Sequence, residues 1–177
     1  IIEESSSDKR EVLSEETAFI MTSMLQGVVD EGTATRIRTY FHLPAAGKTG
    51  TTNDYADAWF IGYTPQVTAG VWVGFDNKTV RFTNADGQGG RAAAPIWGRF
   101  MKYVYADKTI NMPLQYFVRP PSVFQDSVCT ETKQLTRAFC PKKYAEYFTR
   151  KMLPDSCSKH TSSHWKDSEN EGGTINY

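Results

Sequence analysis

The sequence has neither an excess of charge nor a long apolar run. Its 20 basic and 20 acidic residues give a formal net charge of zero, so it offers no basic face for a nucleic acid or for an anionic membrane. No apolar run approaches the roughly 20 residues that a membrane-spanning helix needs, and the start at Ile1 does not resemble a signal peptide. We expect no nucleic-acid partner, and we expect any membrane anchor or export signal to lie upstream of Ile1.

Cysteine and histidine, which form many metal sites and, in the case of histidine, hydrolase triads, are scarce in this sequence. The chain contains three cysteines and three histidines, and no Ser/His/Asp set emerges from their positions. His42 and His164 are more simply explained as surface or core residues. With 40% hydrophobic and 13% aromatic residues, the 177-residue chain can nevertheless bury a core of its own.

A helix is predicted over residues 15–31. Ser14 can cap its first turn, acidic residues follow the cap, and Gly32 ends it. Apolar residues recur at helical spacing along this segment, and the pattern places Met21 and Met24 in the core.

An antiparallel meander and a second helix are predicted next. Turn-forming residues separate three extended segments, which are residues 48–52, 57–63 and 67–75. Their aromatic residues Trp59, Phe60 and Trp72 are expected in the core. The helix is predicted over Ala92–Ala106, with Pro95 near its first turn. Its apolar side, formed by Ile96, Phe100 and Val104, is expected to pack on the sheet.

The first extended segment begins with the triplet Lys48-Thr49-Gly50 and continues with Thr51 and Thr52. Side chains alternate along a strand, so Thr49 and Thr51 share one face while Lys48 points to the other. The two threonine hydroxyls would then line a groove, with the Lys48 cation behind it on the other face of the strand. Such a groove suits a peptide carboxylate bound along an exposed strand edge. A strand with an ordinary surface lysine and β-forming threonines is the plainer explanation of an isolated triplet.

An ordered set of segments gives the triplet a family context. The triplet looks like the third motif of the serine penicillin-recognising enzymes. Together, the segments resemble the end of a class A penicillin-binding protein transpeptidase domain. They are Leu25-Gln26-Gly27-Val28-Val29, Gly32-Thr33, Ala46–Asp54, Asp57–Pro65, Gly70–Gly74 and Gly90–Trp97. This family implies an α/β fold of the α+β kind, with helices packed on an antiparallel sheet.

The first two family motifs, Ser-x-x-Lys and Ser-x-Asn, do not precede Lys48 in the expected order. Four segments match these short patterns, and we interpret all four as coincidences in loops rich in serine and lysine. They are Ser6–Lys9, Ser156–Lys159, Ser163–Lys166 and Ser168–Asn170. We therefore expect the chain to be a C-terminal fragment whose partner is the upstream part of the same protein.

The resemblance implies acyl transfer in the intact enzyme. A serine outside this chain would attack the D-Ala-D-Ala bond of a peptidoglycan stem peptide, and β-lactam antibiotics would be bound in the same place. Thr49 and Thr51 would bind the ligand carboxylate, with Gly50 and Thr52 beside them. The Thr51 backbone N–H would complete an oxyanion hole, and Lys48 would assist proton relay. The chemistry needs no cofactor and no metal.

The cysteines Cys129, Cys140 and Cys157 all lie in the last third of the chain. The resemblance implies an extracytoplasmic location, where thiols tend to pair. The favoured interpretation is a Cys140–Cys157 disulfide, which would stabilise a segment with little core by about 3 kcal/mol. The alternative is a zinc site that adds His160, because Cys157-x-x-His160 has ligand-like spacing, although the outer spacings fit no usual zinc pattern.

We expect two regions. Residues 1–106 would be the C-terminal portion of the transpeptidase domain, and residues 107–177 an irregular C-terminal extension with a Cys-bearing subdomain and a polar end that frays. Two other functions stay open: a serine β-lactamase, which shares the triplet, and a non-catalytic module of the same fold that binds a peptide or a partner.

Overall fold

A computed structural model of the chain describes residues 10–77 and 79–161, and it forms two compact units. The first unit runs to Arg119 and the second begins at Pro120, whereas the sequence predicted a division after Ala106. Residues 107–119 belong with the first unit, where the Phe117 ring lies 5.7 Å from the Tyr63 ring. None of the helices in the described residues has both the length and the apolar character needed to cross a membrane.

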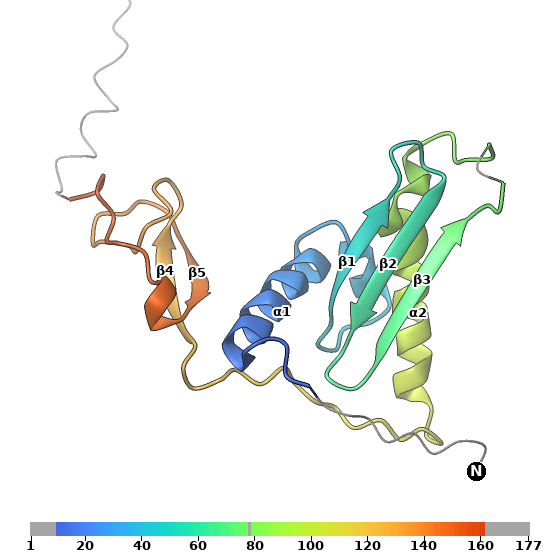
Figure 1. Cartoon of the computed structure of the whole chain (residues 1–177), viewed down its shortest axis with the longest axis horizontal. Coiled ribbons are helices and arrows are strands. Elements are labelled where there is room, and N and C mark those ends of the chain that lie inside the picture. The colour runs from blue at the N-terminus through green and yellow to red at the C-terminus, as the bar shows by residue number, and fades with distance from the viewer. Residues whose placement is uncertain (1–9, 78, 162–177) are drawn as a thin grey trace, which may run out of the picture. The chain divides into compact units, whose positions relative to one another are not determined.

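The first unit is built on a three-stranded antiparallel sheet (Figure 1). Its strands are β1 (Ala46–Thr51), β2 (Asp57–Tyr63) and β3 (Thr68–Gly74), in the order β1-β2-β3. The predicted meander is confirmed. Since β2 is the central strand, β1 is an edge strand of this sheet.

Helix α1 (Glu15–Asp30) packs against β1, and the 3₁₀ helix η1 (Thr35–Thr39) follows it. The predicted cap is confirmed, because the Ser14 hydroxyl accepts the Thr17 N–H at 3.3 Å. The predicted burial of Met21 and Met24 is wrong, since these side chains are 50% and 58% exposed. The buried residues of this helix are instead Ile20 and Val29.

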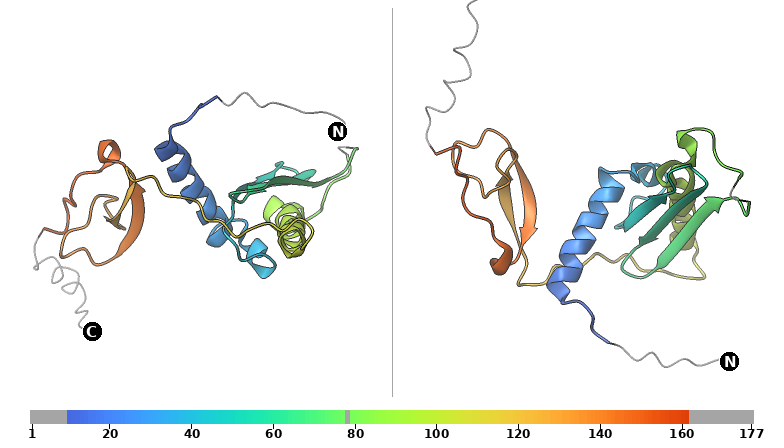
Figure 2. Two further views of the ribbon diagram at one scale, coloured as in Figure 1. Left: turned by 90° about the horizontal axis from the view of Figure 1, so that it is seen from below. Right: turned by 45° about the horizontal axis from the view of Figure 1, so that its top comes forward.

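Helix α2 (Gly89–Ala106) covers one face of the sheet, as the turned view in Figure 2 shows, after the short 3₁₀ helix η2 (Ala85–Gly87). The predicted packing face is wrong, because Ile96 and Phe100 are each 48% exposed. The buried residues repeat at intervals of three or four and are mostly small: Gly89, Gly90, Ala93, Ala94, Trp97, Gly98 and Met101. Small residues let the helix lie close to the sheet, so the bulky apolar residues are left on its outer side.

The core of the first unit forms between α2 and the sheet. Trp97 is fully buried, its ring packs on Phe41 and Phe60, and its indole N–H donates to the Ala69 carbonyl at 3.1 Å. Phe60 is buried as predicted, but Trp59 and Trp72 are each 43% exposed. They lie on the opposite sheet face, which helix α2 does not cover.

The second unit contains a two-stranded antiparallel sheet and irregular segments. Its strands are β4 (Phe124–Cys129) and β5 (Lys143–Phe148), and the 3₁₀ helix η3 (Arg150–Met152) follows. The predicted Cys-bearing subdomain is therefore a unit with its own backbone pairing. The polar end that was predicted to fray falls mostly in residues 162–177, outside the described part of the chain.

Candidate functional site

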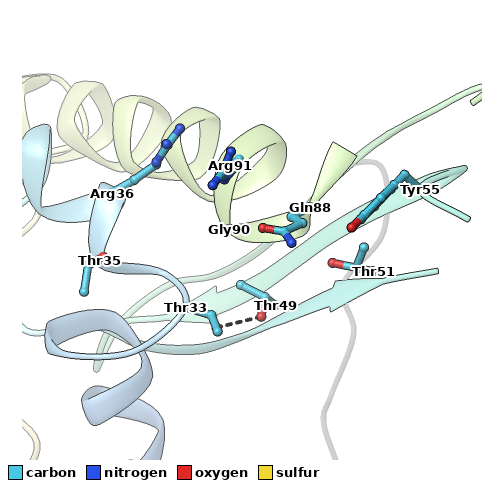
Figure 3. Close-up of a pocket in the computed structure, with 9 residues that line it drawn as sticks. All are labelled: Thr33, Thr35, Arg36, Thr49, Thr51, Tyr55, Gln88, Gly90 and Arg91. Carbon is cyan, nitrogen blue, oxygen red and sulfur yellow. Dashed lines mark hydrogen bonds between the residues drawn. The ribbon is translucent and has the colours of Figure 1, made fainter. Parts of the chain in front are cut away.

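A pocket of about 400 Å³ lies in the first unit between β1, the loop after α1 and the beginning of α2 (Figure 3). Hydroxyl groups, two guanidinium groups and backbone at the helix start make up its lining. The lining residues are Thr33, Thr35, Arg36, Thr49, Thr51, Tyr55, Gln88, Gly90 and Arg91. The pocket is therefore polar and can carry positive charge.

The hydroxyls of Thr49 and Thr51 both face this pocket, as the strand alternation predicted. Thr49 Oγ1 lies 2.8 Å from Thr33 Oγ1, the contact dashed in Figure 3, and Thr51 Oγ1 accepts the Gly89 N–H at 2.9 Å. A threonine hydroxyl has one donor and two acceptor sites. The Gly89 contact uses an acceptor site of Thr51, so its O–H can still donate to a ligand.

Two glycines at the beginning of α2 let the helix meet the edge strand. A Cβ on Gly90 would lie 2.0 Å from the Thr33 carbonyl oxygen, and a Cβ on Gly89 would lie 2.5 Å from the Gly50 carbonyl oxygen. A side chain at Gly89 would therefore push the helix away from β1, and one at Gly90 would push it away from the loop after α1. Because these two residues have no side chain, the beginning of α2 can lie close enough to β1 for the Gly89 N–H to donate to Thr51 Oγ1. This close approach also limits the width of the pocket.

The positive charge of the pocket comes from Arg36 and Arg91, which the sequence analysis did not assign to the site. Arg91 forms an ion pair with Asp86 at 3.6 Å, and both side chains are substantially exposed. Tyr55 completes the wall in a left-handed backbone conformation with φ 57°, which is uncommon for a residue with a side chain. A buried Gly87 fits beneath it, since a Cβ there would lie 2.7 Å from Tyr55 Cβ.

Lys48 lies on the other face of β1, as predicted. It pairs with Ile61 in the strand register, and the next pair on the same sheet face is Gly50 with Trp59. Its ammonium donates to the Thr49 carbonyl at 2.9 Å, and Lys48 is exposed. Lys48 therefore belongs to an uncovered sheet face, shared with Trp59, Ile61 and Trp72, while the pocket lies across the strand from it.

Thr52, another predicted substrate-binding residue, organises the turn after β1. Its Oγ1 accepts the N–H groups of Ala56 and Asp57, each at 2.9 Å. The Thr52 hydroxyl and backbone N–H groups hold the pKa of the Asp54 carboxyl below its usual range, helped by Arg81. Thr52 and Gly50 do not line the pocket.

Several pocket residues lay in segments that carried the family resemblance without being assigned a role. Thr33 stands in the Gly32-Thr33 pair, and Gly90 and Arg91 begin the segment that became α2. Two glycines before a run of alanines were a signal of close helix packing. No local pattern in the sequence indicated a pocket role for Arg36 or Tyr55, because only the folded chain brings the two residues together beside β1.

The three cysteines are free thiols in the second unit, so the predicted Cys140–Cys157 disulfide is wrong. Cys129, Cys157 and His160 are fully buried. Burial raises the pKa of the Cys157 thiol, but hydrogen bonds from the Thr132 hydroxyl and from nearby backbone N–H groups outweigh it and lower the pKa to about 6. The thiols gather around the His160 ring, whose Nδ1 lies 3.4 Å from Cys129 Sγ and 3.3 Å from Cys157 Sγ.

Of the short serine patterns, only Ser156–Lys159 falls within the described residues. It lies in the second unit beside the thiols, where Ser158 bonds to the Gln134 side chain. Ser6–Lys9, Ser163–Lys166 and Ser168–Asn170 lie outside the described residues.

Comparison with known proteins gives a consistent result. Residues 2–102 match the family model described as the penicillin binding protein transpeptidase domain. The chain is 36% identical over 148 residues to penicillin-binding protein 1A of Pseudomonas aeruginosa, a match that covers 84% of this chain and 17% of the relative. It is 40% identical over 121 residues to penicillin-binding protein 1A of Aquifex aeolicus, covering 68% of this chain and 16% of the relative.

A crystal structure of penicillin-binding protein 1A from Haemophilus influenzae has a similar fold. The match has a TM-score of 0.68 and 29% sequence identity, and it covers 81% of this chain and 21% of that chain. The expected resemblance and the helix-on-antiparallel-sheet fold are both confirmed. The chain spans less than a fifth of the length of the two curated relatives.

Proposed function

Because the chain belongs to the penicillin-binding protein transpeptidase domain family, we propose that it forms the carboxylate-binding wall of a peptidoglycan D,D-transpeptidase. In the intact enzyme, a serine attacks the peptide bond between the two terminal D-alanines of a stem peptide and releases the last one. An amine of a neighbouring stem then attacks the acyl-enzyme and forms the cross-link. The reaction takes place outside the cytoplasm and contributes to the cell wall.

The observation that carries this proposal is the pocket beside the edge strand. Thr49 and Thr51 present hydroxyls from one face of β1, and Arg36 and Arg91 add positive charge to the same pocket. An extended peptide can pair with the free edge of β1 while its terminal carboxylate accepts hydrogen bonds from the hydroxyls. The carboxylate of a β-lactam has the same charge and would occupy the same place.

Lys48 acts from the opposite face of β1 in this proposal. That face exposes Trp59, Ile61 and Trp72 with exposed fractions of 43%, 53% and 43%. Relatives are several times longer than this chain, and their additional chain provides an occupant for such an apolar face. The part of the protein that carries the nucleophile would pack there, where Lys48 can assist proton transfer and the Thr51 N–H can stabilise the oxyanion.

The proposal is tested by removing one pocket hydroxyl in the full-length protein. Thr49→Val keeps a β-branched side chain of similar volume, so the strand should persist. Loss of a hydrogen bond to a charged group should slow penicillin acylation by about 1.5–3 kcal/mol, roughly 10-fold to 150-fold. The measurement is the rate of labelling by a fluorescent penicillin.

Two controls separate binding from folding. Thr68→Val makes the same substitution on the exposed part of β3, away from the pocket, and should leave the rate unchanged. An esterified penicillin lacks the carboxylate and should acylate the wild type and Thr49→Val at similar rates. If Thr49→Val slowed the ester as much as the acid, the hydroxyl would serve the strand and not the ligand. Sustained penicillin hydrolysis by the full-length protein would favour a β-lactamase instead.

The 177-residue chain alone should not react covalently with penicillin. It supplies the proposed binding wall, whereas the nucleophile is proposed to lie in another part of the protein. Intact mass spectrometry after incubation with penicillin should show only the unmodified chain. A penicilloyl adduct would contradict the division of roles, and its position would identify the reacting serine.

A further inference from the structure

Four side chains with metal-binding atoms converge in the second unit, whereas the proposed transpeptidase pocket belongs to the first unit. The sulfur atoms of Cys129, Cys140 and Cys157 and a ring nitrogen of His160 all lie within 4.8 Å of one another. We propose that these four residues bind one zinc ion that holds the second unit together. This inference does not rest on the proposed transpeptidase function.

The backbone brings the four residues together from three segments. Cys129 ends β4, and its N–H donates to the Gln134 carbonyl at 2.8 Å across a tight turn. The Cys157 N–H donates to the Leu135 carbonyl at 2.7 Å, which ties the last segment to the same turn. Cys140 lies in a separate turn that its N–H closes on the Arg137 carbonyl at 3.1 Å. The cluster therefore follows from backbone pairing and not from chance contact of flexible side chains.

The distances within the cluster suit a tetrahedral metal. His160 Nδ1 lies 3.4 Å from Cys129 Sγ and 3.3 Å from Cys157 Sγ. In a tetrahedral zinc site, bonds of about 2.3 Å to sulfur and 2.1 Å to nitrogen place these atoms roughly 3.6 Å apart. A small adjustment of the side chains would therefore admit the ion.

The groups around the cluster also match a metal site. Glu131 Oε2 lies 3.5 Å from His160 Nε2 and 2.7 Å from the Lys159 ammonium. A carboxylate on the far nitrogen is the usual support for a metal-bound histidine, because it fixes the ring with the other nitrogen toward the ion. The Thr132 hydroxyl donates to Cys157 Sγ at 3.3 Å, and the Arg137 N–H donates to Cys140 Sγ at 3.2 Å. Such donors stabilise thiolates, the form that binds a metal.

The donor set selects zinc. Three thiolates and one imidazole in a buried, closed arrangement are typical of structural zinc, whereas calcium and magnesium prefer oxygen ligands. The small size of the unit gives the ion a structural role. Among its described residues, the buried apolar side chains other than the cysteines are Pro120, Val123 and Val128, and so small a core usually needs a disulfide or a metal.

The direct test is the metal content of the 177-residue chain, purified under reducing conditions without chelators and measured by inductively coupled plasma mass spectrometry. We expect one zinc per chain in the wild type, and loss of that zinc in Cys129→Ser and His160→Ala. His42→Ala is the matched control because His42 is exposed in the first unit, and it should keep the zinc. His160→Cys supplies a fourth thiolate and should also keep it.

A second measurement on the wild type does not depend on whether the variants fold. Cobalt(II) exchanged into the chain should give the visible absorption bands and sulfur-to-metal charge transfer of a tetrahedral thiolate site. A cobalt spectrum without charge transfer, or zinc retained equally by Cys129→Ser and His160→Ala, would overturn the proposal. Stoichiometric iron in place of zinc would overturn the choice of metal. A Cys140–Cys157 disulfide found by non-reducing peptide mapping would overturn the site itself.

Discussion

The interiors of the two units consist of different types of side chain. The first unit buries a continuous apolar cluster in which the Phe41, Phe60 and Trp97 rings meet edge to face or nearly so. The second unit places Cys129, Cys157 and His160 at its centre, fully buried. An apolar core is stable through contacts within the chain, whereas thiols and an imidazole contribute most when an ion joins them. The stability of the two units should therefore respond to different changes.

The two candidate sites differ in the same way. In the first unit, the apolar core positions β1 and α2, and the pocket lies at their edge, so binding groups and core are separate residues. In the second unit, the proposed ligands are themselves the core. Substitutions at the pocket can therefore change ligand binding while the fold persists, but substitutions at the cysteines should change both together.

Removal of zinc should have the largest effect, and it should destabilise the second unit while leaving the first unit folded. Structural zinc stabilises small sites by about 10–16 kcal/mol, more than any single side chain. A strong chelator should therefore abolish the hydrogen-exchange protection of β4 and β5 amides while β1, β2 and β3 amides keep theirs. Readdition of zinc should restore it. If the second unit stayed protected in the chelator, its stability would not depend on a metal.

Truncation of Trp97 should have the largest single-residue effect within the first unit. The side chain is fully buried between the sheet and α2, so Trp97→Ala should destabilise the unit by about 3–5 kcal/mol through lost contacts and a cavity. Native-state hydrogen exchange of β2 amides measures this change. Trp72→Ala is the matched control, because Trp72 is 43% exposed, and its effect should be much smaller. Similar losses of stability for both variants would mean that the sheet face that carries Trp72 is covered in solution.

Gly90→Ala should show that the pocket depends on close packing of α2 against the loop after α1. A Cβ there would lie 2.0 Å from the Thr33 carbonyl oxygen, so Gly90→Ala should destabilise the first unit by about 1–3 kcal/mol. Gly27→Ala is the matched control, because no atom lies within 4 Å of a Cβ at that helical position. It should instead stabilise α1 by about 0.5–1 kcal/mol. Both are measured by the same exchange experiment, and equal effects would refute the packing argument.

Loss of the Thr52 hydroxyl should have the smallest effect. Thr52→Val removes the acceptor of the Ala56 and Asp57 N–H groups, and should cost about 1–2 kcal/mol at the turn after β1. Thr52→Ser keeps the hydroxyl and should restore most of that stability. In the full-length protein, Thr52→Val should slow acylation less than Thr49→Val, because Thr52 does not line the pocket. If Thr52→Val slowed acylation more than Thr49→Val, Thr52 would be a ligand-binding residue.

Local patterns were sufficient to predict the elements of the first unit. The cap at Ser14 and the turns between extended segments predicted α1 and the meander, because capping and turn formation involve neighbouring residues. The alternation of a strand likewise placed Thr49 and Thr51 on one face and Lys48 on the other. The burial of individual side chains was less predictable, and the Met21, Ile96 and Trp72 predictions were wrong because each depends on which element lies opposite.

The family, the order of the main elements and the two pocket hydroxyls could be predicted from short-range patterns in the sequence. In contrast, Arg36 and Tyr55 join the pocket, and Gly89 lets α2 approach β1, only because the folded chain brings distant segments together. The fold also leaves the three cysteines as free thiols close to His160. The extracytoplasmic location implied by the family resemblance favoured a disulfide, but pairing of Leu135 with Ser156 brings the thiols to one histidine ring. Distances through space depend on the fold and not on separation in sequence.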